Sequence, residues 1–411
     1  MPDRVHDAPR ILVFAYACEP RRGSEPGAGW GVVRSLAQVA HCTVLVGPEH
    51  VPGIDRWAAA SGPSGNLTFV QVGEPWWGRY AKHHRLTWFP LYLHWLRRAR
   101  DEGRRRHRER PFDLAYHATY SAFWLPSPVA SFGVPSIWGP VGGAVATPRS
   151  LWGLLGPRGF VGEVLDALTT RTLARLPATR RTWHRATVRI VQNEATLAAL
   201  PRMLQPGTRV LNHATLVDVP PLQRRSPKRQ ILSVGPLEAR KGVALAIHAL
   251  SHTPEDVRLL IVGDGPRRSS LQSLARRLGV AHRVEFVGRV SRDQVFRLWE
   301  EAAGAVFTGL REEGGLALAE AMLCGVPVVV LAHGGAKTLA AGALDPSRVA
   351  MISPASPAVT AREIGTAMTR FCDTPHAELG PNLDARQSVR DLHSAVADAL
   401  RRGREGCQPP P

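Results

Sequence analysis

The sequence predicts an α/β protein with two domains, each built on a parallel β-sheet that carries helices on both faces. Its 411 residues exceed what one ordinary hydrophobic core accommodates. Short, almost continuous apolar runs such as residues 10–17 alternate with segments of helical composition, which is the pattern of buried parallel strands joined by helical crossovers. A linker composition with Pro220, Pro221 and Pro227 divides the series into two halves.

Composition indicates a globular protein with an excess of positive charge. The apolar fraction is 44% and the formal net charge is +18, mostly from arginine. This charge favours anionic partners such as nucleotide phosphates or an anionic lipid surface, or it reflects an arginine-rich genome. Because no segment resembles a nucleic-acid-binding motif, we expect no nucleic-acid partner.

Cysteine usage and hydropathy indicate the compartment. The five cysteines are scattered, without the spacing of a metal site or a disulfide framework. The chain has no apolar signal core, and no run approaches the ~20 apolar residues that a membrane span needs. We therefore expect a cytoplasmic protein that is soluble or peripheral on the inner face of the membrane.

The first predicted domain covers residues 10–212, and its first strand leads into a glycine-containing loop at residues 18–29. A helix is expected over residues 30–40. Gly27 and Gly29, between this strand and helix, suit close approach of the backbone to a phosphate or a sugar. Because the spacing is not G-x-G-x-x-G, a plain turn is the alternative interpretation.

Residues 74–110 combine many aromatic side chains with an arginine-rich end. Leu91, Trp95 and Arg98 fall near helical spacing, which predicts an amphipathic helix with an aromatic face and a basic end. Such a helix suits the interface of an anionic membrane, and it equally suits a packed position against the sheet with a solvated tail. Both interpretations stay open, and residues 76–110 are the predicted place of any peripheral membrane contact.

A histidine ends the strand predicted at residues 112–116. His117 thus lies at the carboxyl end of a parallel strand, where an open α/β sheet places its ligand crevice. A lone histidine is otherwise more often structural, so this position supports both interpretations.

The second predicted domain covers residues 228–383, with strand and turn segments at 231–235, 259–265 and 284–288 and helices between them. This alternation again implies a parallel sheet with helices on both faces. A final helix is expected at residues 384–402.

Residues 311–330, REEGGLALAEAMLCGVPVVV, carry the most specific pattern. A strand-like run ends in a loop with two glycines, and the helix that follows is closed by Gly325 and stopped by Pro327. The glycines let the backbone come close to a ligand, and free amides at the start of the helix make an anion site.

Glu312 in this loop and Glu320 inside the helix lie beside the predicted anion site. Carboxylates are poor phosphate ligands because like charges repel, but they accept hydrogen bonds from hydroxyl groups. Phosphate-binding amides next to hydroxyl-binding carboxylates indicate a nucleotide-sugar pocket. The alternative is an ordinary strand, loop and helix with glutamates at the surface.

This stretch resembles the nucleotide-sugar signature of retaining glycosyltransferases of family 4, which runs roughly E-G-F-G-L, three residues, E-A-M, then G-x-P-V-V. Glu312 and Glu320 match its two glutamates, and Gly315 with Leu316 matches its G-L. Residues 313–314 replace the usual glycine and aromatic. The resemblance implies the GT-B fold, in which two Rossmann-like domains face each other across a cleft and the final helix crosses back to the first domain.

The resemblance also implies how the cleft holds a nucleotide diphosphate sugar. Lys241, in a segment similar to V-G-R-L, three residues, K-G, matches the lysine that contacts the donor diphosphate. Pro236 stands where this pattern has arginine. Another cation, Arg240, Arg289 or Arg311, is therefore expected to stabilise the charge that grows on the leaving phosphate.

The remaining site residues follow from the same resemblance. Glu320 is expected to accept hydrogen bonds from the ribose, Glu312 from the donor sugar, and His117 is expected to lie near the transferred sugar. The predicted catalytic residues are His117, Lys241 and Glu312. The predicted donor contacts, with the base edge at 287–289, are Gly27, Gly29, Arg240, Lys241, Val287, Gly288, Arg289, Gly315, Leu316 and Glu320.

The implied reaction is transfer of a hexose from a nucleotide diphosphate sugar to a hydroxyl of a glycan, a lipid-linked acceptor or a small molecule, with retention at the anomeric carbon. We expect neither a metal nor a cofactor, because no D-x-D motif ends a strand and the resembled enzymes stabilise the leaving group with cations and helix amides. The alternatives are a non-catalytic or weakly active nucleotide-sugar-binding protein and a GT-B-like epimerase or phosphorylase.

Overall fold

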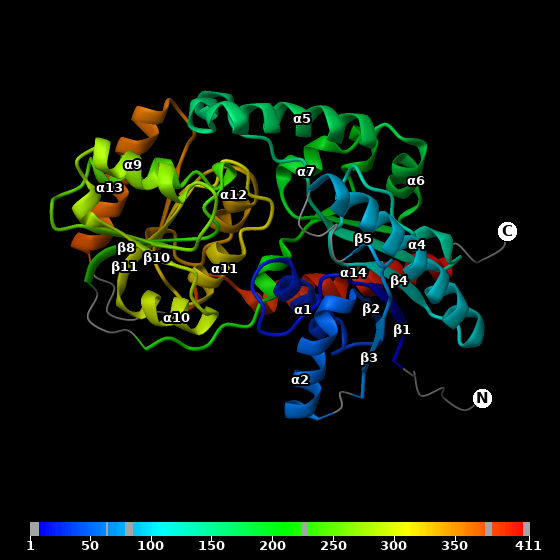
Figure 1. Cartoon of the computed structure of the whole chain (residues 1–411). Helices are drawn as coiled ribbons and strands as arrows, with labels where there is room; N and C mark the ends of the chain where they lie inside the picture. Colours follow the sequence, from blue (N-terminus) through cyan, green and yellow to red (C-terminus); the bar gives the residue numbers. More distant parts are fainter. Residues whose placement is uncertain (1–7, 63–64, 79–84, 224–227, 375–379, 406–411) are drawn as a thin grey trace.

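The protein contains two α/β domains (Figure 1). The computed structural model describes residues 8–62, 65–78, 85–223, 228–374 and 380–405. The first sheet has the strand order β3-β2-β1-β4-β5-β6-β7 and the second the order β10-β9-β8-β11-β12-β13. All neighbouring strands in both sheets pair in parallel. The predicted fold class, two doubly wound parallel-sheet domains, is therefore confirmed.

The first domain alternates strands with covering helices. Its strands are β1 (Arg10–Phe14), β2 (His41–Val46), β3 (Leu67–Gln71), β4 (Leu114–His117), β5 (Ser136–Val141), β6 (Val188–Val191) and β7 (Thr208–Val210). Its helices are α1 (Glu25–Leu36), α2 (Val51–Ser61), α4 (Arg85–Glu109), α5 (Gly156–Ala174), α6 (Pro177–Arg185) and α7 (Glu194–Ala199).

The side chains of β1 show why this strand is apolar throughout. Ile11 and Val13 belong to the core cluster that contains residues of α1, whereas Leu12 and Phe14 belong to the cluster that contains residues of α4. Because successive side chains of a strand point to opposite faces, a sheet covered by helices on both sides needs an apolar residue at every position.

The aromatic face of α4 packs against this sheet. Tyr92 and Trp95 are fully buried in the same cluster as β1 residues, while Trp76, ahead of the helix, is exposed. Of the two interpretations of residues 76–110, the packed helix is therefore the observed one, and the predicted membrane contact loses the aromatic face on which it depended. Residues 79–84 of that prediction lie outside the described residues.

The second domain repeats the alternation. Its strands are β8 (Lys228–Val234), β9 (Arg258–Val262), β10 (Val284–Gly288), β11 (Ala302–Phe307), β12 (Val328–Leu331) and β13 (Val349–Ile352). Its helices are α8 (Val243–Leu250), α9 (Arg268–Arg277), α10 (Arg292–Glu301), α11 (Leu316–Leu323), α12 (Gly334–Ala341) and α13 (Pro357–Asp373).

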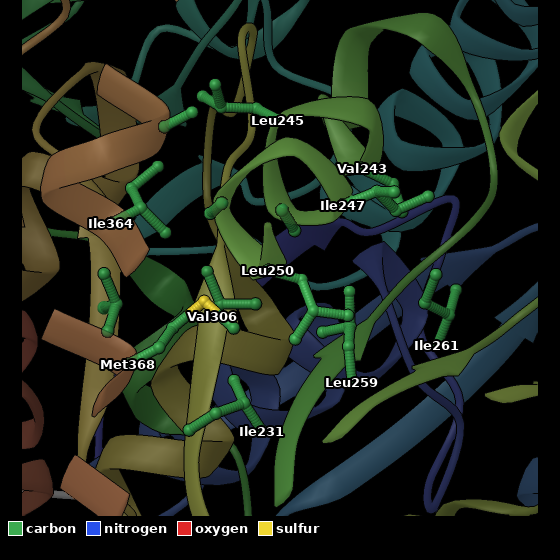
Figure 2. Close-up of a cluster of buried hydrophobic side chains, with 14 of the residues drawn as sticks. Ile231, Val243, Leu245, Ile247, Leu250, Leu259, Ile261, Val306, Ile364 and Met368 are labelled. Carbon is green, nitrogen blue, oxygen red and sulfur yellow. The ribbon is translucent and has the colours of Figure 1, made fainter. Parts of the chain in front are cut away.

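Figure 2 shows the core on one face of the second sheet. Ile231 of β8 and Val306 of β11 meet Leu250 of α8 and Met368 of α13, and all four side chains are almost completely buried. The opposite face is covered by α10, α11 and α12.

Two described segments cross from one domain to the other, besides the chain connection between β7 and β8. Helix α14 (Ala385–Glu405) returns to the first sheet, where Leu392 and Val396 join the cluster of β1. In the other direction, Leu151 and Leu155 join the core of the second domain. Helix α5 therefore starts on the second domain and crosses to the first, as Figure 1 shows.

Candidate functional site

A cavity of about 790 Å³ lies between the two domains, and a smaller one of about 370 Å³ adjoins it on the side of the second domain. The segments after the carboxyl ends of β4, β5 and β6 contribute to the larger cavity, together with α5 and the start of α11. Ser24, Glu312, Gly315 and Leu316 line both cavities. The carboxyl ends of the strands are the usual place for a ligand in open α/β sheets.

The loop between β11 and α11 forms the junction of the two cavities. Gly315 caps α11 with φ 75° and ψ 45°, a left-handed conformation that glycine adopts without a steric penalty. Gly335, at the start of α12, donates its amide to the Glu312 carbonyl at 2.8 Å. A Cβ at this glycine would lie 2.0 Å from the Glu313 carbonyl oxygen. The loop thus rests directly on the backbone of α12.

Lys241 and Glu312 face each other at this junction. The ammonium of Lys241 forms an ion pair with Glu312, and the Gly315 amide donates to the same carboxylate at 3.2 Å. Both side chains are about one-fifth exposed, at 20% and 19%. A cation and a helix amide therefore converge on one point, which suits a phosphate, and in the free protein the Glu312 carboxylate holds them there.

Glu320 lies deeper in the smaller cavity. Its carboxylate accepts a hydrogen bond from Arg292 Nε at 2.5 Å, and the Arg292 guanidinium also bonds to the carbonyl of Asp218. Burial raises the pKa of Glu320, an effect that Arg292 partly offsets. The structure thus places Lys241, Glu312 and Glu320 around the two joined cavities, as predicted from their sequence positions.

The candidate cations that could replace the missing arginine lie in different places. Arg240 lines the larger cavity and pairs with Glu238. Arg311 also lines it, and its guanidinium contacts the carboxylates of Asp166 at 2.6 Å and Glu163 at 3.4 Å.

Arg289 lines neither cavity. The smaller cavity instead contains Arg292, which is not among the residues predicted from the sequence. Arg292 is the first residue of α10, and its contact with Glu320 of α11 is not visible in the local sequence pattern.

His117 does not reach the cavities. Its ring is buried, with the Tyr92 hydroxyl 2.8 Å from Nε2 and the Ser127 hydroxyl 2.9 Å from Nδ1. Burial lowers the pKa of His117 to about 4. The structure therefore does not place His117 at the cavities, because its ring is buried and both ring nitrogens lie at hydrogen-bond distance from the hydroxyls of Tyr92 and Ser127. The predicted contact with the transferred sugar finds no support in this geometry.

The glycines of the first loop serve packing instead of ligand contact. Helix α1 begins at Glu25, earlier than predicted, so Gly27 and Gly29 lie within it. A Cβ on Gly27 would lie 2.1 Å from the Arg22 carbonyl oxygen, and one on Gly29 would lie 2.2 Å from that of Ala17.

Neither Gly27 nor Gly29 lines a cavity. Gly23 and Ser24, in the same loop, line the smaller one. The loop thus contributes Gly23 and Ser24 to the cavity, whereas the two predicted glycines lie outside it.

The residues predicted to hold the base edge, 287–289, do not line the cavities, but the residue that follows them does. Val287, Gly288 and Arg289 line neither cavity, and the Gly288 carbonyl accepts a hydrogen bond from the Gly263 amide at 2.8 Å. Val290, just after this segment, lines the smaller cavity. The Gly288 carbonyl is thus occupied by a hydrogen bond at the edge of the sheet, and the lining of the cavity begins at Val290.

Glu25 and His213 form a pair in the larger cavity that the sequence did not predict. Their side chains approach to 3.5 Å, and the Tyr120 amide donates to the Glu25 carboxylate at 2.9 Å. Burial alone would raise the pKa of Glu25, but His213 and the Tyr120 amide outweigh it and the pKa falls. His213 is buried, and its Nδ1 has no hydrogen-bond partner among the described residues. The only sequence signal was an acidic residue in the first loop.

Glu313, at a position where the family 4 pattern has glycine, binds the first domain. Its carboxylate accepts hydrogen bonds from the Val145 amide at 3.0 Å and from Asn193 Nδ2 at 3.2 Å. The neighbouring Gly314 carbonyl accepts from Asn212 Nδ2 at 2.8 Å. We call this set of contacts the interdomain clasp. It holds the loop before α11 against the first domain.

The second domain is similar in sequence to known enzymes. Residues 218–348 match the family of glycosyl transferases group 1. A glycosyltransferase of Methanocaldococcus jannaschii is 37% identical over 110 residues, 26% of this chain and 28% of that protein. The D-inositol 3-phosphate glycosyltransferase of Xylanimonas cellulosilytica is 38% identical over 114 residues, 26% of this chain and 27% of that protein. The matched segments thus span about a quarter of these curated relatives.

Solved structures resemble the whole chain. HepE of Anabaena in complex with UDP and glucose gives a TM-score of 0.54 at 16% identity, covering 96% of this chain and 100% of that one. The sucrose-phosphate synthase of Thermosynechococcus elongatus gives 0.56 at 17% identity, covering 96% and 98%. At these identities the likeness concerns the fold. The chain has the GT-B fold, and its segment 218–348 matches the glycosyl transferases group 1.

Proposed function

We propose that this protein is a retaining glycosyltransferase that moves a hexose from a nucleotide diphosphate sugar to a hydroxyl of a glycan, a lipid-linked acceptor or a small molecule. One observation carries the proposal: Lys241 and the amide end of α11 converge beside Glu312 and Glu320 in joined cavities between the domains. The cation and amides suit a diphosphate, and the carboxylates suit hydroxyl groups. The family matched by residues 218–348 supports the same activity.

In the proposed reaction, the bond between the anomeric carbon and the β-phosphate oxygen breaks, and a bond from that carbon to the acceptor oxygen forms on the same face. The acceptor proton passes to the leaving phosphate oxygen. Lys241 and the amides at the start of α11 stabilise the charge on that phosphate without a metal. One cation at about 4 Å contributes about 4 kcal/mol at intermediate dielectric.

The ion pair between Lys241 and Glu312 implies an order in which contacts change when the donor binds. A diphosphate that reaches Lys241 competes with the Glu312 carboxylate for the ammonium. Once released, this carboxylate is free to accept hydrogen bonds from the hydroxyls of the donor sugar. Glu320, held by Arg292, is in place for the ribose.

The larger cavity is the proposed acceptor side. Trp88, Tyr120 and Trp124 contribute aromatic surface to its wall, and such rings combine an apolar face with a polar edge. Glu25 and His213 lie between this wall and the loop before α11. An acceptor hydroxyl would therefore approach the donor from the first domain.

A thermal-shift screen of nucleotide diphosphate sugars tests donor binding, because a ligand that binds only the folded state stabilises it by about 2.7 kcal/mol at a hundred times its Kd. We expect one donor class to raise Tm and Lys241→Ala to weaken its binding by about tenfold to hundredfold. The matched control is Lys228→Ala, which removes an exposed lysine that pairs with Glu301 at 2.5 Å. Equal losses in the two variants, or no shift with any donor, would contradict the proposal.

A non-catalytic binding protein is the second candidate, because Pro236 replaces an arginine and Glu313 a glycine of the family 4 pattern. Incubation of the stabilising donor with candidate acceptors, followed by NMR of the products, separates the possibilities. A transferase forms a glycoside that keeps the donor's anomeric configuration, and an epimerase changes the donor sugar. A phosphorylase releases a sugar phosphate only when a glycan and inorganic phosphate are supplied in a parallel incubation. A binding protein leaves the donor intact.

A further inference from the structure

Helix α5 exposes a stripe of large apolar side chains. Of the large hydrophobic residues that are exposed in the described part of the chain, five belong to this helix: Phe160, Val161, Val164, Leu165 and Leu168. Leu165 and Leu168 are 58% and 57% exposed. Single exposed apolar residues are common, but a contiguous group of this kind marks an interaction surface. We call these five residues the α5 stripe.

The stripe lies on one side of the helix, and the cavity lies on another. Phe160, Val164 and Leu168 follow each other at intervals of four residues and therefore share a face. Glu163, Asp166 and Thr170 of the same helix line the larger cavity instead. Figure 1 shows α5 crossing over the region between the two domains. One helix thus presents polar residues to the cleft and apolar residues to solvent.

The charges around the α5 stripe are almost all positive. Residues 156–185 contain six arginines and two acidic residues, Glu163 and Asp166. Both acids face the cavity, where they contact Arg311. The exposed arginines of α5 and its C-cap, Arg158, Arg171 and Arg175, have no ion-pair partner among the described residues.

We propose that the α5 stripe and the arginines beside it form a docking surface for an anionic lipid bilayer. An apolar stripe flanked by arginine lies in a membrane interface with its apolar side chains among the acyl chains and its cations at the headgroups. The net charge of +18 adds a long-range attraction to such a surface. Within the described ranges, no helix has the length and apolarity to cross a membrane, so the contact is peripheral.

This docking would bring the mouth of the larger cavity to the bilayer. Arg171 and Arg175 line that cavity as well as the basic edge of the α5 stripe. An acceptor with its lipid part in the membrane could then present its hydroxyl to the cleft without leaving the bilayer. This consequence rests on the proposed transferase activity, whereas the docking itself does not.

Vesicle co-sedimentation of the full chain tests the proposal without any turnover. The two vesicle populations are phosphatidylcholine alone and an equal mixture of phosphatidylcholine with phosphatidylglycerol. We expect strong binding to the mixture, weak binding to phosphatidylcholine, and a decrease with added salt because charges at the surface are screened. The double variant Leu165→Gln/Leu168→Gln should lower binding to the mixture at least about tenfold.

The matched control is Leu344→Gln/Met351→Gln, which changes two side chains of the second domain that are 61% and 50% exposed. This control should bind vesicles like the wild type. Circular dichroism should show the same Tm for all three proteins, since the substituted side chains are exposed.

Three outcomes would overturn the proposal. The first is no binding to the anionic mixture, and the second is an equal loss in both double variants. The third is a dimer in solution that Leu165→Gln/Leu168→Gln dissociates without changing vesicle binding, because the α5 stripe would then join two copies of the chain. A positive donor screen with no vesicle binding would leave the proposed function intact and refute only the docking surface.

Discussion

The carboxylate of Glu312 occupies the position at which we propose that the donor phosphate binds. It accepts from the Gly315 amide and pairs with Lys241, the two groups that we expect to hold the donor diphosphate. A negative side chain in this position keeps the lysine extended toward the cavity in the absence of ligand. In the proposed function, it would also repel a diphosphate until the ammonium changes partners.

Replacing Glu312 by glutamine separates these two effects. Without the competing charge, we expect Glu312→Gln to bind a nucleoside diphosphate without sugar about threefold to tenfold more tightly than the wild type. Transfer should fall at least about tenfold, because the hydrogen bonds of a charged acceptor to the donor sugar are lost. Isothermal titration and initial rates measure the two quantities. Weaker diphosphate binding would instead assign Glu312 to the positioning of Lys241.

Sequence spacing predicted which residues of one continuous loop and helix lie together at the cavities. Glu312, Gly315 and Glu320 were found this way because the backbone between them determines their relative positions. The position of His117 could not be predicted in this way, because its ring contacts Tyr92, which belongs to a helix in another part of the sequence. Whether a side chain at a strand end faces the cleft is a tertiary property.

At the scale of elements, the glycines at the start of α1 had two interpretations, close approach of the backbone to a ligand or close packing of the backbone within the protein. The structure shows the packing. The first turns of α1 pass so close to the preceding loop that Gly27 and Gly29 have no room for a Cβ. Helix α4 shows the same competition, since its aromatic residues could face lipid or sheet and the sheet buries them. Composition identifies such amphipathic elements but does not determine the surface against which they pack.

Gly29→Ala tests the packing role of α1. The new Cβ would lie 2.2 Å from the Ala17 carbonyl oxygen, so the helix must shift and the free energy of unfolding should fall by about 1–3 kcal/mol. Gly23→Ala is the control in the adjoining loop, because no atom lies within 4 Å of its added Cβ. Urea denaturation followed by tryptophan fluorescence compares them. A midpoint for Gly29→Ala equal to that of Gly23→Ala would refute the packing explanation.

At the scale of the whole molecule, the interdomain clasp joins residues from four separate parts of the chain. Glu313 contacts Val145 and Asn193, and Asn212 holds the next residue. The pair of Glu25 and His213 is assembled in the same way. Such contacts leave no local pattern, which is why the fold and the loop before α11 were predictable from the sequence while the pair of Glu25 and His213 was not.

The clasp makes stability depend on pH through Glu313. Desolvation raises the pKa of this carboxyl above its ordinary value of 4.5. A raised pKa in the folded state means that folding favours the protonated form. The contribution of Glu313 is therefore complete below pH 4.5 and is lost as the pH rises through the raised value.

We expect the free energy of unfolding of the wild type, relative to that of Glu313→Gln, to fall as the pH rises from 4.5 through the raised pKa of Glu313, and to level off above that pKa. Urea denaturation at a series of pH values measures the difference. Glu285→Gln, at an exposed position of β10, is the control. A constant difference between wild type and Glu313→Gln would show that burial in the clasp does not affect this carboxyl.

The most direct test of the proposed donor site is a crystal structure with the nucleotide diphosphate sugar that gives the largest thermal shift. The account predicts diphosphate oxygens at about 3 Å from Lys241 Nζ and from the amides at the start of α11, with the ribose hydroxyls at Glu320. A donor bound elsewhere, with Lys241 and Glu312 still paired, would contradict it.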